Sequence, residues 1–242
     1  MPHTTSIIVR SALAALSLGV LGCGSELVLP DSPGSAAQEL ALTKVDGDGQ
    51  NGLVGERLQN PLVVRVLNPE QHAITGKSVT FELSDPAGGT IDPDTAITNE
   101  DGEAVSQWTL GPVPGTYTVV AKLVGVEGED KVAEFRAEAD PGAPASLTAL
   151  SPVLQPGGRG RAVATPPVVQ VLDRFGNPVP DALVTWQVIA GGGAATPLTP
   201  VSDLEGKASV EWTLGDRIGI HKLTAAAEGA GTPVVFEARI LF

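Results

Sequence analysis

The strongest constraint on the fold of this chain is an internal repeat, in which the same motifs return in the same order. The run VVRVL at 63–67 returns 105 residues later as VVQVL at 168–172, and WTLG at 108–111 returns 104 residues later at 212–215. The match needs a single one-residue deletion over about 95 residues, which chance does not produce. The chain therefore contains two copies of one domain.

The repeat also sets the domain boundaries that we predict. The first copy occupies residues 40–139 and the second occupies 145–242, with a short linker at 140–144 (DPGAP) between them. A copy of about 100 residues is large enough to bury a hydrophobic core of its own.

Side-chain alternation in both copies is typical of β-strands. In 208–214, Ala208, Val210, Trp212 and Leu214 share one face, and polar residues occupy the other. Turn-forming residues separate such runs, and no stretch after residue 40 shows a sustained helical period. We predict an all-β fold with one β-sandwich per copy. The aromatic residues predicted to lie in the two cores are Phe81, Trp108, Phe135, Trp186, Trp212 and Phe236.

Three motifs stand out at the starts and turns of the two copies. They are DRFGNPVPDALVTW at 173–186, DLEGKASVEWTLG at 203–215, and the opening of the first copy, with DGQ at 48–50, VG at 54–55 and PLVV at 61–64. Together these motifs resemble bacterial Ig-like domains of the invasin/intimin type. The resemblance implies two tandem immunoglobulin-like β-sandwich domains that act as a spacer or adhesive unit and not as a catalyst. The first copy has NPEQHA at 68–73 in place of the usual Gly-Asn-Pro, which leaves the type of that turn open.

The N-terminus has the features of an export signal. Its apolar run, 11–22, has twelve residues, whereas a membrane-spanning helix needs about 20 and a signal-peptide core about 7–15. The run ends in VLGC at 20–23, which resembles the lipobox of bacterial lipoproteins and implies lipidation of Cys23 after removal of residues 1–22. The alternative is an ordinary secretory signal followed by a free thiol.

The segment after the signal is predicted to be a tether. Residues 23–39 are rich in Ser, Gly, Pro and Ala and show no useful alternation, as is typical of a flexible linker. With lipid on Cys23, the protein is expected to be an exported, membrane-anchored lipoprotein of the outer membrane or cell surface.

Composition argues against most catalytic and nucleic-acid functions. With 28 acidic and 15 basic residues, the chain has a net charge of −13, which disfavours nucleic-acid binding because phosphates must be neutralised by Lys and Arg. Its single cysteine excludes an intrachain disulfide and a cysteine-rich metal site. His72 falls in a predicted turn, and His221 falls where the first copy has Tyr117, so we interpret both as structural. The glycines at 191–193 lack the strand–helix context of a phosphate-binding loop and predict a turn.

Paired acidic residues are the remaining candidates for a metal site. They are Asp46 and Asp48, Asp92 and Asp94, and Glu127, Glu129 and Asp130. An EF-hand that begins at Asp46 would have Arg57 at its twelfth position, where calcium needs Glu. We therefore favour a solvated acidic surface over calcium binding, and predict no catalytic residue, metal or cofactor.

The sequence thus predicts a lipid-anchored cell-envelope protein, not an enzyme, with a binding, adhesion or spacer role. Its expected partners are the membrane, through the N-terminal lipid, and an unidentified protein or glycan of the cell envelope, but not nucleic acid. The alternative is an accessory module of an envelope enzyme or a carbohydrate-binding protein. Carbohydrate binding would need exposed aromatic rings, and only Phe175, in a predicted turn, breaks the inward alternation.

Overall fold

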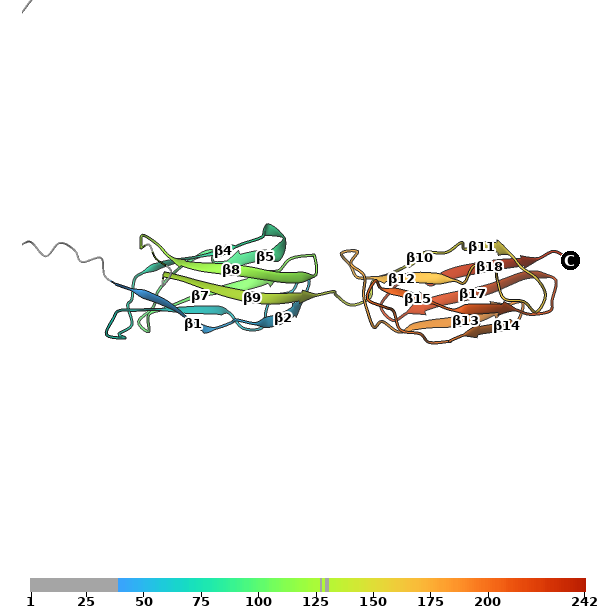
Figure 1. Cartoon of the computed structure of the whole chain (residues 1–242), viewed down its shortest axis with the longest axis horizontal. Coiled ribbons are helices and arrows are strands. Elements are labelled where there is room, and N and C mark those ends of the chain that lie inside the picture. Colours follow the sequence, from blue (N-terminus) through green and yellow to red (C-terminus); the bar gives the residue numbers. More distant parts are fainter. Residues whose placement is uncertain (1–38, 127, 129–130) are drawn as a thin grey trace, which may run out of the picture. The chain divides into compact units, whose positions relative to one another are not determined.

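The computed structural model describes residues 39–126, 128 and 131–242, and this part of the chain consists mainly of β-strands and turns (Figure 1). One 3-10 helix, η1 (Pro86–Gly88), is the only helix in the described residues. The same residues contain no helix with the length and hydropathy needed to cross a membrane. The prediction of an all-β chain with two tandem sandwiches is confirmed.

The first sandwich is made of two sheets. Its strands are β1 (Ala41–Asp46), β2 (Gln50–Leu53), β3 (Leu62–Leu67), β4 (Ser78–Leu83), β5 (Gly89–Asp92), β6 (Thr95–Ile97), β7 (Glu103–Leu110), β8 (Gly115–Leu123) and β9 (Val132–Asp140). One sheet has the order β1-β3-β7-β5 and the other β2-β9-β8-β4-β6. Every pairing is antiparallel except that of β2 with β9, which is parallel.

The second sandwich repeats this topology. Its strands are β10 (Ser146–Ala149), β11 (Leu154–Pro156), β12 (Val168–Leu172), β13 (Val184–Ala190), β14 (Gly193–Thr196), β15 (Lys207–Ser209), β16 (Glu211–Leu214), β17 (Gly219–Ala227) and β18 (Val234–Ile240). One sheet has the order β11-β18-β17-β13, with β11 parallel to β18. The other face is formed by β10-β12-β15 and β14-β16. Strands β15 and β16 correspond to β7, interrupted at Val210.

Each sandwich has its own hydrophobic core, in which the predicted aromatic residues lie. All six are at most 2% exposed, and Trp108 and Trp212 are completely buried. In β7 the residues alternate between buried and more exposed positions, as the period of two requires. The core residues of the second sandwich form a separate cluster from those of the first. The predicted core is confirmed.

The turn at which the two copies differ in sequence has the same hydrogen bonds in both. In the turns 68–72 and 173–177, the N–H of the first residue donates to the carbonyl O of the fifth residue, at 3.0 Å in the first copy and 2.9 Å in the second. The N–H of the fourth residue donates to the carbonyl O of the first residue, at 3.0 and 3.1 Å respectively. The left-handed position is filled by Gly176 (φ 87°) in the second copy and by Gln71 (φ 65°) in the first. The sequence difference therefore changes the residue at the strained position and keeps the turn.

We expect Trp212→Ala to unfold the second sandwich, or nearly so, while the first melts as before. Trp212 is fully buried, and within the described residues its indole Nε1 has no hydrogen-bond partner, so packing holds the ring. Loss of a buried Trp side chain costs about 3–5 kcal/mol, a large part of the roughly 5–15 kcal/mol of a domain. Calorimetry of the full chain should show one transition lost and one kept. The half-exposed Ile220→Ala serves as control, and a joint shift of both transitions would contradict independent domains.

Candidate functional site

Two groups of predicted site residues lie outside the residues that the structure describes. They are Cys23, the proposed lipidation site, and the acidic group Glu127, Glu129 and Asp130. Lipidation of Cys23 therefore stays a prediction.

His221 holds a corner of the second sandwich. It is completely buried, and its Nε2 lies 2.9 Å from the carbonyl O of Arg217. At the corresponding corner of the first sandwich, the hydroxyl of Tyr117 donates to the carbonyl O of Val113 at 3.0 Å. Both side chains bond to the residue four positions earlier and so fasten the start of a long strand, β17 or β8, to the preceding loop. The interpretation of His221 as a structural residue is confirmed.

The acidic residues that open the first copy serve a turn. The Asp46 carboxylate accepts a hydrogen bond from the N–H of Gly47 at 2.7 Å. The Asp48 carboxylate accepts one from the N–H of Arg136 at 2.9 Å and pairs with Lys44. Across the described part of the chain, no group of three or more His, Cys, Asp or Glu side chains is arranged to hold a metal ion.

Asp173 connects the linker to the second sandwich, a role that the sequence analysis missed. It is 3% exposed, and its carboxylate accepts hydrogen bonds from the N–H groups of Gly142, Phe175 and Asn177 at 3.0, 2.8 and 2.9 Å. Partial burial acts to raise the pKa of this carboxyl, but the hydrogen bonds outweigh burial and hold the pKa below its ordinary value. The available signal was an Asp that opens a Gly-Asn turn directly after a strand.

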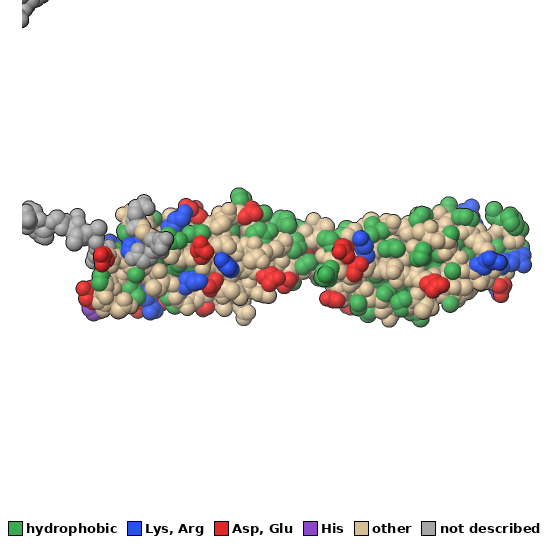
Figure 2. Space-filling model, viewed as in Figure 1, with side chains coloured by type: hydrophobic (Ala, Val, Ile, Leu, Met, Phe, Trp, Pro, Cys, Tyr) green, Lys and Arg blue, Asp and Glu red, His purple; other side chains and the backbone are tan. Residues whose placement is uncertain are grey.

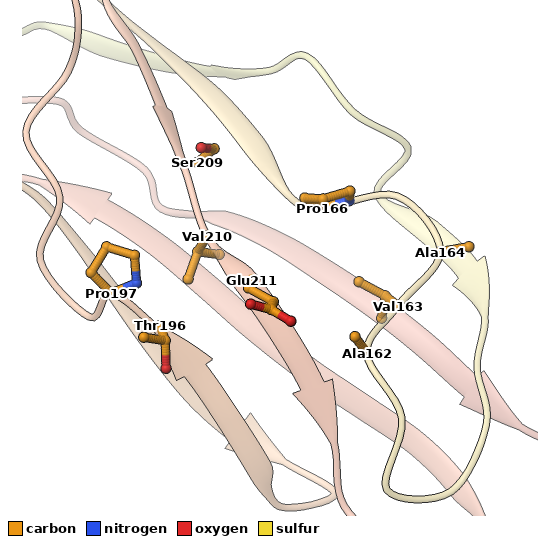
Figure 3. A pocket seen from close by; sticks show the side chains of 9 residues that line it. All are labelled: Ala162, Val163, Ala164, Pro166, Thr196, Pro197, Ser209, Val210 and Glu211. Atoms are coloured by element: carbon orange, nitrogen blue, oxygen red, sulfur yellow. The ribbon is translucent and has the colours of Figure 1, made fainter.

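A depression of about 400 Å³ lies on the outer side of the second sandwich (Figure 3). It forms where residues 164–166 leave the strand that contains β15 and β16. On either side of them, the N–H of Val163 donates to the carbonyl O of Trp212 and the N–H of Val210 donates to that of Pro167. Ala162, Ala164, Pro166 and Pro197 contribute apolar walls, and the carboxylate of Glu211 lies among them. No pattern in the sequence pointed to this site.

The two sandwiches have the same fold but different surfaces. Residues 40–139 contain 16 acidic and 7 basic residues, whereas 145–242 contain 8 acidic and 7 basic. Of the 21 large hydrophobic residues that are exposed in the described chain, 14 belong to the second sandwich. Hydrophobic side chains are spread over the visible face of that sandwich in Figure 2. The second sandwich therefore presents the less charged and more apolar surface.

An apolar edge of the second sandwich, formed by Leu183, Leu198 and Val201, illustrates the difference. Leu183 and Val201 pair across the edge and are each more than half exposed. The matching pair in the first sandwich is Ser78 with Ile97. Prolines flank the edge segment on the side of Leu198, and because proline has no N–H, they limit the addition of another strand.

Several solved structures are similar to this chain. The chain is similar to FdeC, an Escherichia coli adhesin, with 18% identity over 84% of this chain and a TM-score of 0.53. It spans 65% of the length of that structure. It is also similar to the D0-D1 domain of intimin, with 18% identity over 84% of this chain and 100% of that one and a TM-score of 0.34. For invasin, a bacterial integrin-binding protein, the identity is 19% over 83% of this chain and 39% of that one, with a TM-score of 0.37.

In fold, the two sandwiches are immunoglobulin-like β-sandwich domains similar to those of FdeC. The likeness to FdeC, at a TM-score above 0.5, carries this assignment. FdeC itself is an adhesin. No protein-family model matches the sequence, and no curated protein is similar to it.

We expect Asp173→Asn to destabilise the second Ig-like domain at neutral pH, by about 1.5–3 kcal/mol for hydrogen bonds to a charged group. A carboxyl whose pKa is lowered by folding adds stability above its unfolded pKa and loses it as the pH falls through the folded value. The difference between parent and variant should therefore shrink below the ordinary pKa of 3.8.

Urea unfolding of the full chain at pH 7 and at about pH 2.5 measures this difference. Asp216→Asn, an exposed acid in the same domain, is the control and should change little at either pH. A difference of the same size at both pH values would mean that the charge of Asp173 does not contribute.

Proposed function

We propose that this chain is a lipid-anchored module of the bacterial cell surface that binds a partner protein, without catalysis, through its second Ig-like domain. The observation that carries the proposal is the contrast between two copies of one fold. Because both copies need the same core, that core cannot account for the 14 exposed large hydrophobic residues of one and the 7 of the other. Exposed apolar surface beyond the needs of the fold is typical of a protein–protein contact.

The charge distribution supports the same division of labour. The excess of acidic residues in the first domain favours solubility and repels anionic surfaces, as a spacer next to a membrane requires. The second domain has nearly balanced charge, so a partner can approach its apolar edge without desolvating many carboxylates.

The likeness to FdeC supports a surface location and an adhesive role, since FdeC is an adhesin. The chain spans only part of that structure, so the partner of this protein has to be found by experiment. Recognition at the apolar edge would use the side chains of Leu183, Leu198 and Val201, because the neighbouring prolines obstruct pairing with a further strand.

A carbohydrate-binding role has less support. Sugar rings bind against exposed aromatic faces, and among the aromatic residues of the described chain only Phe175 and the terminal Phe242 are exposed. The ring of Phe175 is already covered on one side by Arg174, whose guanidinium lies 4.6 Å from the ring centroid.

The adhesive role is tested by replacing the apolar edge with the residues that the first domain has there. We expect Leu183→Ser with Leu198→Asp to reduce attachment of beads coated with the full chain to cultured epithelial cells by about tenfold, since loss of two apolar anchors costs roughly 1.4 kcal/mol or more. Ile97→Ser, on the matching edge of the first domain, is the control and should leave attachment unchanged. Equal attachment of the parent and the double variant, or none by the parent, would contradict adhesion through this edge.

Anchoring is tested separately. We expect Cys23→Ala to abolish incorporation of a labelled fatty acid and to move the protein from the membrane fraction to the soluble fraction, because several acyl chains at about 0.8 kcal/mol per buried CH₂ hold a protein firmly. Ser25→Ala, two residues away, is the control. Equal labelling of parent and Cys23→Ala would contradict the lipoprotein assignment.

A further inference from the structure

The depression on the second Ig-like domain has a counterpart in the first, and the register of the strands proves the match. The N–H of Val163 donates to the carbonyl O of Trp212 at 2.9 Å, just as the N–H of Leu58 donates to that of Trp108. Thr196 pairs with Glu211 across β14 and β16. In the first domain, Asp92 pairs with Gln107 across β5 and β7.

In the first domain, the side chain at the position of Glu211 is Gln107, and it forms a hydrogen bond with the backbone of the same domain. The Nε2 of Gln107 donates to the carbonyl O of Leu58 at 2.7 Å, and the neighbouring Ser106 hydroxyl donates to the carbonyl O of Pro93 at 2.6 Å. Gln107 is half-buried as a result. The amide is therefore committed to the fold.

The second domain cannot repeat these bonds. Glu211 stands in place of Gln107 and, when ionised, only accepts hydrogen bonds, so it cannot donate to the carbonyl O of Val163. Val210 stands in place of Ser106 and has no hydroxyl. The walls are also smaller, since Ala162 replaces Arg57. These substitutions leave an exposed carboxylate in an open apolar depression.

Glu211 is available for a ligand. Within the described residues it takes part in no ion pair and in no side-chain hydrogen bond. Val163 and Thr196 line the same depression (Figure 3), and Thr196 is the partner of Glu211 across β14 and β16. The carbonyl O of Val163 corresponds to that of Leu58, which accepts the hydrogen bond of Gln107 in the first domain. A group that donates several hydrogen bonds and has a positive charge would complement all three, and an alkyl stem would fit against Ala162, Ala164 and the two prolines.

We propose that this depression, centred on Glu211, binds the basic side chain of a partner protein, with arginine as the best fit. Arginine has five N–H donors in a rigid fork and a three-carbon stem, which match a carboxylate next to a carbonyl and an apolar wall. The volume of about 400 Å³ is at the small end of ligand sites, roughly 300–1,000 Å³, as suits one side chain. The inference rests on the proposed function in one respect, that the partner is a protein.

The test uses the full chain with Cys23→Ala and a small probe, Nα-acetyl-arginine N-methylamide. In ¹H–¹⁵N spectra, the amides of Ala164, Thr196 and Glu211 should shift in a saturable way. Nα-acetyl-norleucine N-methylamide, which keeps an alkyl stem but has no charge, should shift them far less. The amide of Gln107, in the first domain, should not move and is an internal control.

Variants then separate charge from shape. Glu211→Gln should weaken binding of the arginine probe by about tenfold, and it should fold because the first domain has Gln at that position. Glu205→Gln, an exposed acid on a turn of the same domain, should bind as the parent does. Ala162→Arg should block the site by restoring the side chain of the first domain.

Equal shifts with both probes, or unchanged affinity in Glu211→Gln, would overturn the proposal. Either result would leave the attachment assay of the apolar edge unaffected, because that assay depends on Leu183 and Leu198. If the edge variant Leu183→Ser with Leu198→Asp loses adhesion but still binds the arginine probe normally, the apolar edge and the depression at Glu211 contribute separately to partner binding.

Discussion

Each Ig-like domain depends on the packing of one tryptophan that points inward from β7 or β16. Trp108 on β7 and Trp212 on β16 are completely buried, and their backbone carbonyls accept hydrogen bonds from Leu58 and Val163. The same residue thus fills the core and holds the bulged segment that precedes β3 or β12. With no disulfide available, this packing must supply the stability that a cystine gives to antibody domains.

The equivalence of the two cores allows the two surfaces to differ. The indole Nε1 of Trp108 donates to the carbonyl O of Gly88, whereas that of Trp212 has no partner in the described part of the chain. His221 takes the corner position of Tyr117. Substitutions of this kind keep the topology because the new side chain occupies the same buried position with different hydrogen bonds. Outward residues are under no such restraint, and the acidic surface of one domain and the apolar edge of the other follow from that freedom.

The pocket at Glu211 illustrates how a binding site can arise from a structural position. In the first domain the amide of Gln107 completes a backbone hydrogen bond across the bulge. Change of that amide to a carboxylate removes the donor and leaves an exposed acceptor in its place. A basic side chain of a partner would donate to this acceptor, so the two copies of one motif would have structural and binding roles respectively.

The fold class, the two copies and the aromatic cores follow from the sequence, because the repeat and the period-two alternation are local patterns that burial enforces. The alignment of His221 with Tyr117 also indicated that His221 is a structural residue. Three features emerge only from the folded chain. Asp173 fastens the linker, the turn at 68–72 keeps its geometry with Gln71 at positive φ, and Glu211 lies in a depression. These features depend on residues far apart in the chain, such as 162–166 and 196–197. The alternation of apolar and polar residues along one strand does not predict which other segments lie next to that strand in the fold.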